Sequence, residues 1–197
     1  QTELTYIDSV FESLALAENE RDLNEIRAEL AEQGYVRRKA GKKNQKQPAL
    51  SAPLKFKTSD GFTVLVGRNN RQNDKLTMKD ANNNDIWFHT KNIPGSHTVL
   101  VTDGKAPTET AMEEAAVLAA QHSRAKDSAQ VPVDYTQIRY VSKPQGAKPG
   151  MLYKYKIRPA AGGEADHCDP YGFWMELRPG SASALWPLGG YRFTDES

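Results

Sequence analysis

Turn-forming residues divide the region between residues 54 and 158 into short apolar segments, and this division limits the possible folds most. Residues 54–58 and 62–67 flank Ser59, Asp60 and Gly61, a pattern typical of a β-hairpin. The same reasoning predicts further strands at residues 86–89, 98–102, 133–141 and 152–157. Such short segments favour a sheet over a helical bundle.

Two segments in this region are predicted to be helices. Residues 108–125 are rich in alanine, and Thr108 is a suitable N-cap. One face of this helix is expected to hold Ala115, Leu118, Ala119 and His122. A shorter helix should open after the polar turn at 68–73 and reach about Ala81. We therefore predict an α/β (α+β) fold with a mixed, mainly antiparallel sheet and two helices.

The first 36 residues have helical periodicity. Apolar side chains recur at spacings of three and four, at Leu4, Ile7, Phe11 and Leu14 and then, in a second helix, at Leu23, Ile26 and Leu30. Asp22 is the expected N-cap of the second helix, and Gly34 its terminating glycine. We expect both stripes to be packed and the first helix to be the end of a longer one.

Charge is distributed unevenly along the chain. Residues 1–36 carry 2 basic and 9 acidic side chains, residues 37–158 carry 22 and 10, and residues 159–197 carry 2 and 6. The stretch 37–53 holds six of the basic side chains, two prolines and no acid, which predicts a mobile linker. A basic body between acidic ends favours a polyanionic partner; a lysine-rich solvated surface is the alternative.

Composition excludes several other classes. No run of 18 apolar residues exists, which predicts no membrane insertion. The N-terminus lacks the basic and apolar regions of a signal peptide. Cys168 is the single cysteine, so a disulfide framework and a multi-cysteine zinc site are ruled out. We expect an intracellular protein, ending in a tail or extension of unknown origin at 159–197.

A glycine and six donor-bearing side chains precede the first short helix of the domain. This is not a P-loop, because no Gly-Lys-Ser/Thr follows. Free N–H groups beside Arg68 and Arg71 suit a phosphate or a base edge. However, Asn69, Asn70 and Asn73 could equally satisfy a buried turn. The sequence leaves both interpretations open.

Aromatic and basic side chains interleave on the strand at 86–89 and the loop after it. Alternation places Trp87 and His89 on one face of the strand and Phe88 on the other. One face should be core, and the other could stack on a nucleic-acid base. For Trp87 a core position is at least as well supported, because a tryptophan buries so much area.

Two arrangements could carry chemistry. His89 and His97 could hold zinc with a nearby aspartate, but their spacing matches no zinc pattern. Ser96 and His97 could be a nucleophile and its base, but sequence neighbours rarely face each other correctly and no nucleophile elbow is present. We predict no metal, no cofactor and no enzymatic activity, with a metal-dependent enzyme as a remote alternative.

Four segments together resemble the NFACT family. Residues 67–77 (GRNNRQNDKLT) resemble the opening signature of its RNA-binding domain, and residues 85–97 (DIWFHTKNIPGSH) its central motif. Two late motifs are matched by residues 131–136 (VPVDYT) and 143–150 (KPQGAKPG). The likeness covers roughly residues 1–150 in family order, with residues 1–36 similar to the end of the family's coiled coil. The family's earlier domains are absent, so we expect a C-terminal part.

The resemblance implies an RNA-binding module of a ribosome-associated quality control factor. Its expected partners are tRNA, the RNA of a large ribosomal subunit that still holds peptidyl-tRNA, and the remainder of the full-length chain. Some family members are called fibronectin- or fibrinogen-binding proteins, so a surface adhesin module is the alternative. The expected location is cytoplasmic and ribosome-associated, with the cell surface as the alternative.

The expected domains are a helical segment at 1–36, the linker at 37–53, the RNA-binding domain at 54–158 and the tail at 159–197. The predicted RNA face joins the polar helix start, the Trp-His strand and two Pro-Gly loops. Its residues are Arg68, Asn69, Asn70, Arg71, Asn73, Trp87, His89, Lys91, Ser96, His97, Lys143 and Lys148.

Overall fold

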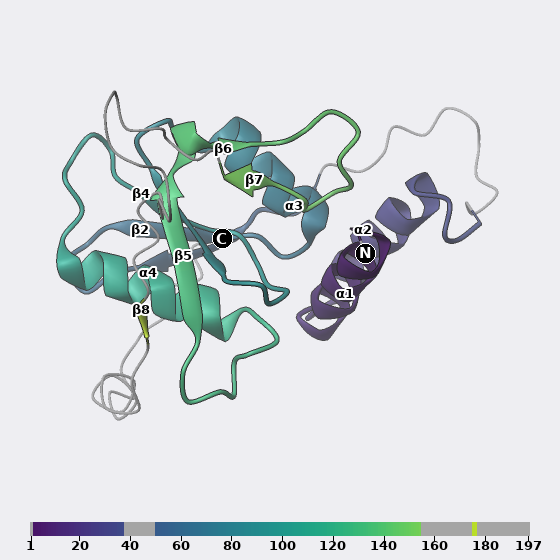
Figure 1. The fold of residues 1–197 in the computed structure, drawn as a ribbon, viewed down its shortest axis with the longest axis horizontal. Coiled ribbons are helices and arrows are strands. Elements are labelled where there is room, and N and C mark those ends of the chain that lie inside the picture. Colours follow the sequence, from purple (N-terminus) through teal and green to yellow (C-terminus); the bar gives the residue numbers. More distant parts are fainter. Residues whose placement is uncertain (1, 38–49, 155–174, 177–197) are drawn as a thin grey trace, which may run out of the picture.

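The computed structural model describes residues 2–37, 50–154 and 175–176, and their fold is α+β, as predicted. Two N-terminal helices lie beside a domain of strands and helices (Figure 1). Residues 38–49 of the predicted linker lie outside the described residues, as does the predicted tail except for residues 175–176. Cys168 lies outside them as well. No helix among the described residues is both long and apolar enough to cross a membrane.

The sheet is built from short strands, which are β1 (Leu54–Lys57), β2 (Thr63–Val66), β3 (Ile86–Thr90), β4 (Thr98–Val101), β5 (Pro132–Gln137) and β8 (Met175–Glu176). They lie in the order β1-β2-β4-β3-β5-β8, and every neighbouring pair is antiparallel. The predicted hairpin is confirmed: Thr58 N donates to Phe62 O at 2.9 Å. Gly61 has a φ of +91°, a conformation in which glycine carries no steric cost.

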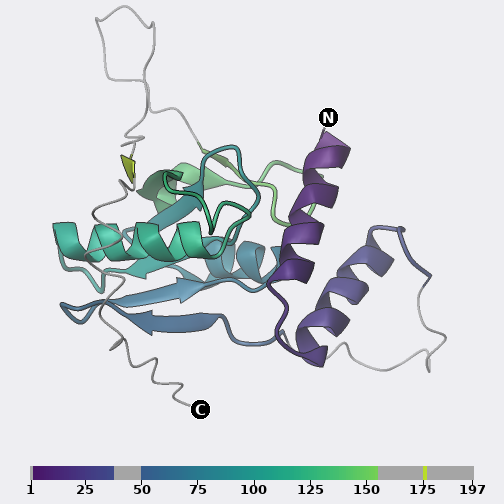
Figure 2. The ribbon, with the colours of Figure 1, turned by 90° about the horizontal axis from the view of Figure 1, so that it is seen from below.

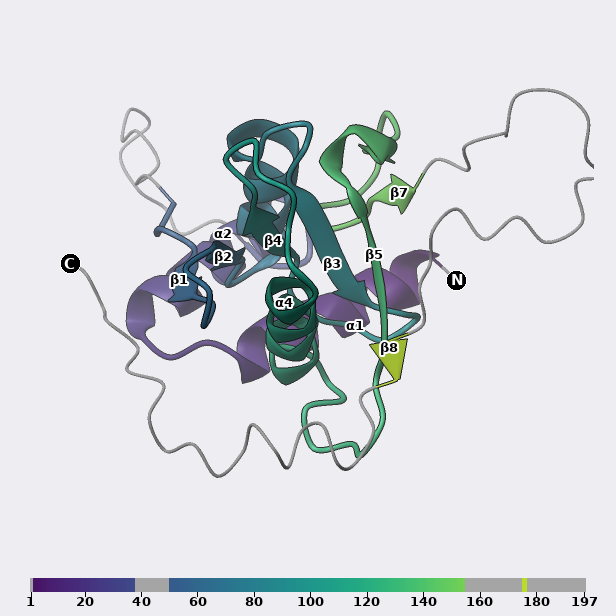
Figure 3. The same cartoon turned by 90° about the vertical axis from the view of Figure 1, so that its left-hand side faces the viewer.

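Helix α4 (Glu109–Gln121) covers one face of the sheet, as Figures 2 and 3 show. Thr108 caps it as predicted, accepting from Ala111 N at 3.0 Å. Alanines such as Ala115 and Ala119 are fully buried, and their small size lets the helix approach the strands closely. Phe88 is 0% exposed in this layer, which forms the main apolar core.

The opposite face of the sheet carries the second predicted helix. It begins as α3 (Asn70–Lys75) and continues as a π-helical turn, η1 (Leu76–Asp80). Leu76 packs here with Trp87 and Val99 in a second apolar cluster. Trp87 and Phe88 thus lie on opposite faces, as the strand period predicts.

The long strand predicted at 133–141 is wrong in its second half. Strand β5 ends at Gln137 and is followed by a 3-10 turn, η2 (Ile138–Tyr140), before β6 (Val141–Ser142) pairs with β7 (Tyr153–Lys154). The chain bends because the turn before β3 takes its backbone donors: Ile138 N donates to Asp85 O at 2.9 Å, and Arg139 N to Asn83 O at 3.2 Å.

The N-terminal pair consists of α1 (Thr2–Ala15) and α2 (Glu20–Glu32). The apolar face predicted for α1 is wrong at three of its four positions, since Leu4, Phe11 and Leu14 are 72%, 61% and 40% exposed. The fourth, Ile7, is partly buried and packs as predicted. The buried side is rotated and includes Tyr6 and Val10. The prediction of a helix is confirmed, but the predicted face is not the buried one. The buried side of α1 includes a tyrosine and polar side chains, which an apolar pattern does not identify.

The ends of α2 test two further expectations. The N-cap is Asn19, whose side chain accepts from Asp22 N at 3.0 Å, so the assignment of Asp22 as cap is wrong. Asp22 is instead buried and faces the domain. Gly34 follows the helix with a φ of +84°, as predicted for a terminating glycine.

Candidate nucleic-acid interface

The donor-rich turn, residues 67–73, follows β2 and includes the first residues of α3, and its asparagines are buried. Asn69 is the N-cap of α3 and accepts from Gln72 N at 3.0 Å. The Asn73 side chain accepts from His97 N at 3.1 Å. A Cβ on Gly67 would lie 2.1 Å from Asn73 Oδ1, so only glycine permits this approach. The side chains that satisfy the turn thus belong to its architecture.

Carboxylates from α2 and the residue before its cap meet the outer side of the same turn. Arg68 Nη1 lies 3.4 Å from both Asp22 Oδ2 and Glu18 Oε2. Arg71 Nη1 lies 3.7 Å from Glu32 Oε1. Two of the predicted RNA-binding cations are therefore paired with acids of the N-terminal helices.

The amides of the turn are engaged in the same way. Asn69 Nδ2 donates to Glu25 Oε2 at 2.8 Å, and Gln72 Nε2 donates to the same oxygen at 3.2 Å. Asn70 Nδ2 donates to Glu29 Oε1 at 3.1 Å. Amide donors satisfy both carboxylates, so the acids remain compatible with a largely buried position.

The two central carboxylates respond differently to this environment. Burial raises the pKa of Glu29, and its hydrogen bonds from Asn70 and Tyr6 offset the rise only in part. Burial also pushes the pKa of Glu25 upward, but donors from Ser51, Asn69 and Gln72 outweigh it and hold the pKa below its usual value. Glu25 is thus a stabilised anion, whereas the charge of Glu29 carries a desolvation cost.

Trp87, His89 and His97 form a ring cluster on the face of the sheet covered by α3 and η1. The rings of Trp87 and His89 are stacked, with centroids 5.7 Å apart and planes 6° apart. His97 packs edge-on against both, at 5.4 and 5.5 Å. Trp87 is 4% exposed and His89 is half-buried. His89 therefore has the more accessible ring, with Trp87 beneath it.

His97 is a buried, neutral member of this cluster. Burial lowers its pKa to about 3, helped by the nearby His89. Its Nδ1 lies 3.0 Å from Thr77 Oγ1 and 3.2 Å from Asn73 O. Ser96 is also buried, and its backbone N donates to His122 O at 2.8 Å. Ser96 and His97 are thus engaged in separate structural contacts.

The two late lysines lie on the loop between β6 and β7. Lys143 pairs with Asp74, whose pKa burial raises, and donates to Lys148 O at 3.1 Å. Lys148 Nζ lies 3.4 Å from Glu3 and donates to Tyr35 OH at 2.5 Å. It also sits 4.8 Å from the ring centre of Tyr6, a cation–π contact. Lys148 thus joins this loop to the N-terminal helices.

The loop after β3, residues 91–96, packs against neighbouring parts of the domain. The Lys91 backbone N donates to Pro132 O at 2.8 Å, and the Lys91 side chain is half-buried. Gly95 pairs with Ser123 at the end of α4, and a Cβ on Gly95 would lie 2.8 Å from the Ser123 Cβ. The loop is therefore held tightly against the domain.

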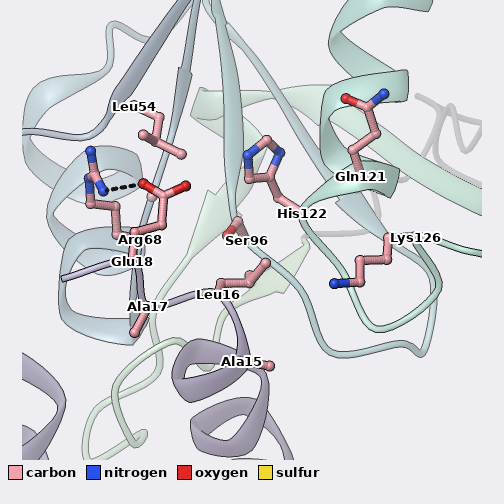
Figure 4. Close-up of a pocket in the computed structure, with 11 residues that line it drawn as sticks. Ala15, Leu16, Ala17, Glu18, Leu54, Arg68, Ser96, Gln121, His122 and Lys126 are labelled. Atoms are coloured by element: carbon pink, nitrogen blue, oxygen red, sulfur yellow. Dashed lines mark hydrogen bonds and ion pairs between the residues drawn. The ribbon is translucent and has the colours of Figure 1, made fainter. Parts of the chain in front are cut away.

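A pocket of about 260 Å³ opens between the end of α1 and the end of α4. Figure 4 shows Arg68 and Glu18 on one side of it and His122 and Lys126 on the other. Its volume falls below the roughly 300–1,000 Å³ of small-molecule sites. This pocket is therefore small for a small-molecule site.

The sequence reasoning missed the covering of the turn by α2. It also missed Arg124, whose Nη2 lies 3.3 Å from Asp8 and whose Nε lies 3.8 Å from Glu12. The signal available was charge: an acidic helical segment and a basic domain in one chain attract each other.

Comparisons with known proteins match two family descriptions. "NFACT protein RNA binding domain" covers residues 53–153, and "NFACT N-terminal and middle domains" covers residues 1–49. The chain is 48% identical over 153 residues to "Rqc2 homolog RqcH" of Bacillus subtilis, which is 77% of this chain and 26% of that protein. The chain thus spans about a quarter of the length of these relatives.

A solved structure and a shorter match complete the comparisons. The C-terminal part of the fibronectin/fibrinogen-binding protein from Streptococcus suis has a TM-score of 0.70 at 39% identity, covering 78% of this chain and 60% of that one. A separate match to a 1,4-alpha-glucan branching enzyme of Rubrobacter xylanophilus is 47% identical over 51 residues, 25% of this chain and 7% of that protein. The two family models leave residues 154–197 unmatched.

Proposed function

The chain belongs to the NFACT family, and from this premise we propose that it is an RNA-binding module of a ribosome-associated quality control factor. Its partners are tRNA and the RNA of the large ribosomal subunit, and it performs no chemistry itself. The observation that carries this proposal is the family match at 53–153, which spans the turn, the β3 strand and both Pro-Gly loops. The protein acts in the cytoplasm, bound to the ribosome.

The domain division follows the same match. We propose that residues 1–36 are the end of a coiled coil, residues 37–53 a linker and residues 54–158 the RNA-binding domain. The charge pattern supports this division, because residues 37–158 hold 22 of the 26 basic side chains. Phosphate contacts dominate the affinity of such domains, and clustered lysines and arginines supply them.

The twelve residues of the proposed RNA face take three roles. Arg68, Arg71, Lys91, Lys143 and Lys148 meet phosphates. His89 offers a ring to a base, since it is the accessible member of the cluster. The buried side chains of Asn73, Trp87, Ser96 and His97 shape the surface from within. Asn69 and Asn70 are buried as well, and their side-chain amides are donors that Glu25 and Glu29 occupy.

Salt dependence of tRNA binding tests this function. If four to six or so phosphates are neutralised, log affinity should fall against log salt with a slope of about −3 to −5. Lys91→Ala should flatten the slope by about one unit. Lys105→Ala is the matched control, because Lys105 is also a lysine and is exposed. It lies on the turn after β4, whereas the Lys91 loop lies at the opposite end of that strand. An affinity for tRNA that does not change with salt concentration would contradict the proposal.

One observation favours a second candidate, the binding of fibronectin or fibrinogen: the solved relative carries that name. A basic domain also attracts acidic proteins through charge alone. Competition separates the two, because tRNA should displace either protein at physiological salt if the RNA face is the specific site. Retention of fibronectin under excess tRNA would favour the adhesin instead.

A further inference from the structure

Five acids line one side of the second helix and the residues before it. Asp22, Glu25, Glu29 and Glu32 follow spacings of three, four and three, which places them on one face of α2. Glu18 lies just before the N-cap of the helix. At a rise of about 1.5 Å per residue, the helical part of this acidic stripe, from Asp22 to Glu32, extends roughly 15 Å, with one carboxyl group about every 5 Å. It is a row of closely spaced acidic side chains.

Every carboxylate of the acidic stripe contacts the donor-rich turn. Taken in order along α2, they meet Arg68, Arg68 again, Asn69 with Gln72, Asn70, and Arg71. Side chains of these types contact phosphate oxygens in nucleic-acid complexes. The carboxylates of the acidic stripe thus occupy the donors of a surface that suits a phosphate backbone.

The contact between the acidic stripe and the donor-rich turn is made by polar side chains. The apolar cluster of the N-terminal helices, built on Tyr6, Val10 and Ile26, is separate from both clusters of the domain and reaches it through Met151. Ion pairs at its two ends are accessible: the side chains of Glu18 and Glu32 are 70% and 33% exposed. Exposed ion pairs contribute little stability and exchange readily with other ions.

We propose that the acidic stripe is an intramolecular substitute for an RNA backbone, which covers the turn until RNA displaces it. This inference rests on the proposed RNA-binding function. The free chain is then mostly closed, and its apparent RNA affinity is reduced by the fraction that is open. When RNA binds, its phosphates replace the carboxylates as partners of the arginines and amides of the donor-rich turn. The desolvation cost of the buried Glu29 carboxylate favours this replacement.

Two charge-matched variants of the full chain test the proposal. The stripe variant carries Glu18→Gln, Glu25→Gln and Glu32→Gln. The control variant carries Glu20→Gln, Glu109→Gln and Glu113→Gln, which are exposed acids away from the turn. Each gains three units of net charge, so general attraction to RNA rises equally. Circular dichroism and thermal unfolding check that both fold, and Glu32→Gln alone serves if the triple stripe variant does not.

Fluorescence anisotropy with labelled tRNA gives the readout. We expect the stripe variant to bind about tenfold more tightly than the control variant, the factor for a chain about nine-tenths closed. Equal affinity of the two variants would overturn the inference while leaving RNA binding intact. Weaker binding by the stripe variant would also overturn it, since α2 would then support the face. Salt-independent or absent binding in all variants would remove the proposed function itself.

Discussion

Two helices pack on the same domain by opposite means. Helix α4 covers the sheet through alanines and apolar strand residues, and Phe88 beneath it is fully buried. Helix α2 meets the turn through carboxylates, arginines and side-chain amides. The first contact is stabilised by removal of apolar surface from water and the second by groups that water, salt or another polyanion can also satisfy.

The difference distinguishes a permanent apolar contact, that of α4, from a polar contact that other ions can replace, that of α2. Apolar burial has no competing ligand in solution, so the α4 layer should remain closed under all native conditions. Carboxylates on arginines and amides can be replaced by phosphates, so the α2 contact should respond to salt, pH and RNA. The following predictions test this contrast, beginning with the largest expected effect.

Loss of the Phe88 ring should break the apolar layer. We expect Phe88→Ala to reduce the free energy of unfolding by about 3–5 kcal/mol, because a large cavity would remain under α4. Phe11→Ala is the control, since Phe11 is 61% exposed and its removal should change stability by about 0.5 kcal/mol or less. Urea unfolding measures both. Equal losses would show that the N-terminal helices belong to the same core.

Gly150 tests how tightly the turn is constrained. Its φ is +77°, and an added Cβ would lie 2.5 Å from Asn70 Oδ1. Gly146 has the same φ with nothing within 4 Å of its Cβ position. Both alanine variants should lose about 1–2 kcal/mol to the left-handed backbone, and Gly150→Ala should lose about 1 kcal/mol more through Asn70. Matching losses in urea unfolding would mean that Asn70 moves freely.

The acidic stripe should give two opposite pH dependences, with smaller effects. Because the pKa of Glu29 is raised, its contribution to stability is lost as pH rises above about 4.5. The free energy of unfolding of Glu29→Gln should therefore increase relative to that of the native chain as the pH approaches neutral. The lowered pKa of Glu25 means that its contribution is present above about 4.5 and lost as pH falls, so Glu25→Gln should be less stable than the native chain at neutral pH and the gap should close in acid. Unfolding curves between pH 3 and 7 or so check both. Parallel dependences would contradict the assigned environments.

Much of the fold is predictable from sequence because its signals are local. Turn residues mark the β1–β2 hairpin, alanines and a threonine cap mark α4, and alternation separates Trp87 from Phe88. The bend after Gln137 is not predictable in this way, because donors that leave the strand find acceptors more than fifty residues earlier in the chain.

The sequence indicated which residue types lie in the turn, but not whether their side chains are exposed or buried. Sequence reasoning identified the turn and left open whether Asn69 and Asn70 face a ligand or fill a buried turn. The structure buries both and supplies partners from Glu25 and Glu29. Which acids meet which donors depends on tertiary docking. Besides the opposite charges of the two segments, the helical period of the acids on α2 could have indicated this contact.

Hydrogen–deuterium exchange with and without RNA tests the central claim most directly. Backbone amides of α2 are compared with those of α4 in the same sample, at a salt concentration where tRNA is bound. We expect RNA to speed exchange in α2, because displaced helices lose protection, while exchange in α4 stays unchanged. Unchanged or slower exchange in α2 on RNA binding would contradict the account, since RNA and the acidic stripe would then not share the turn.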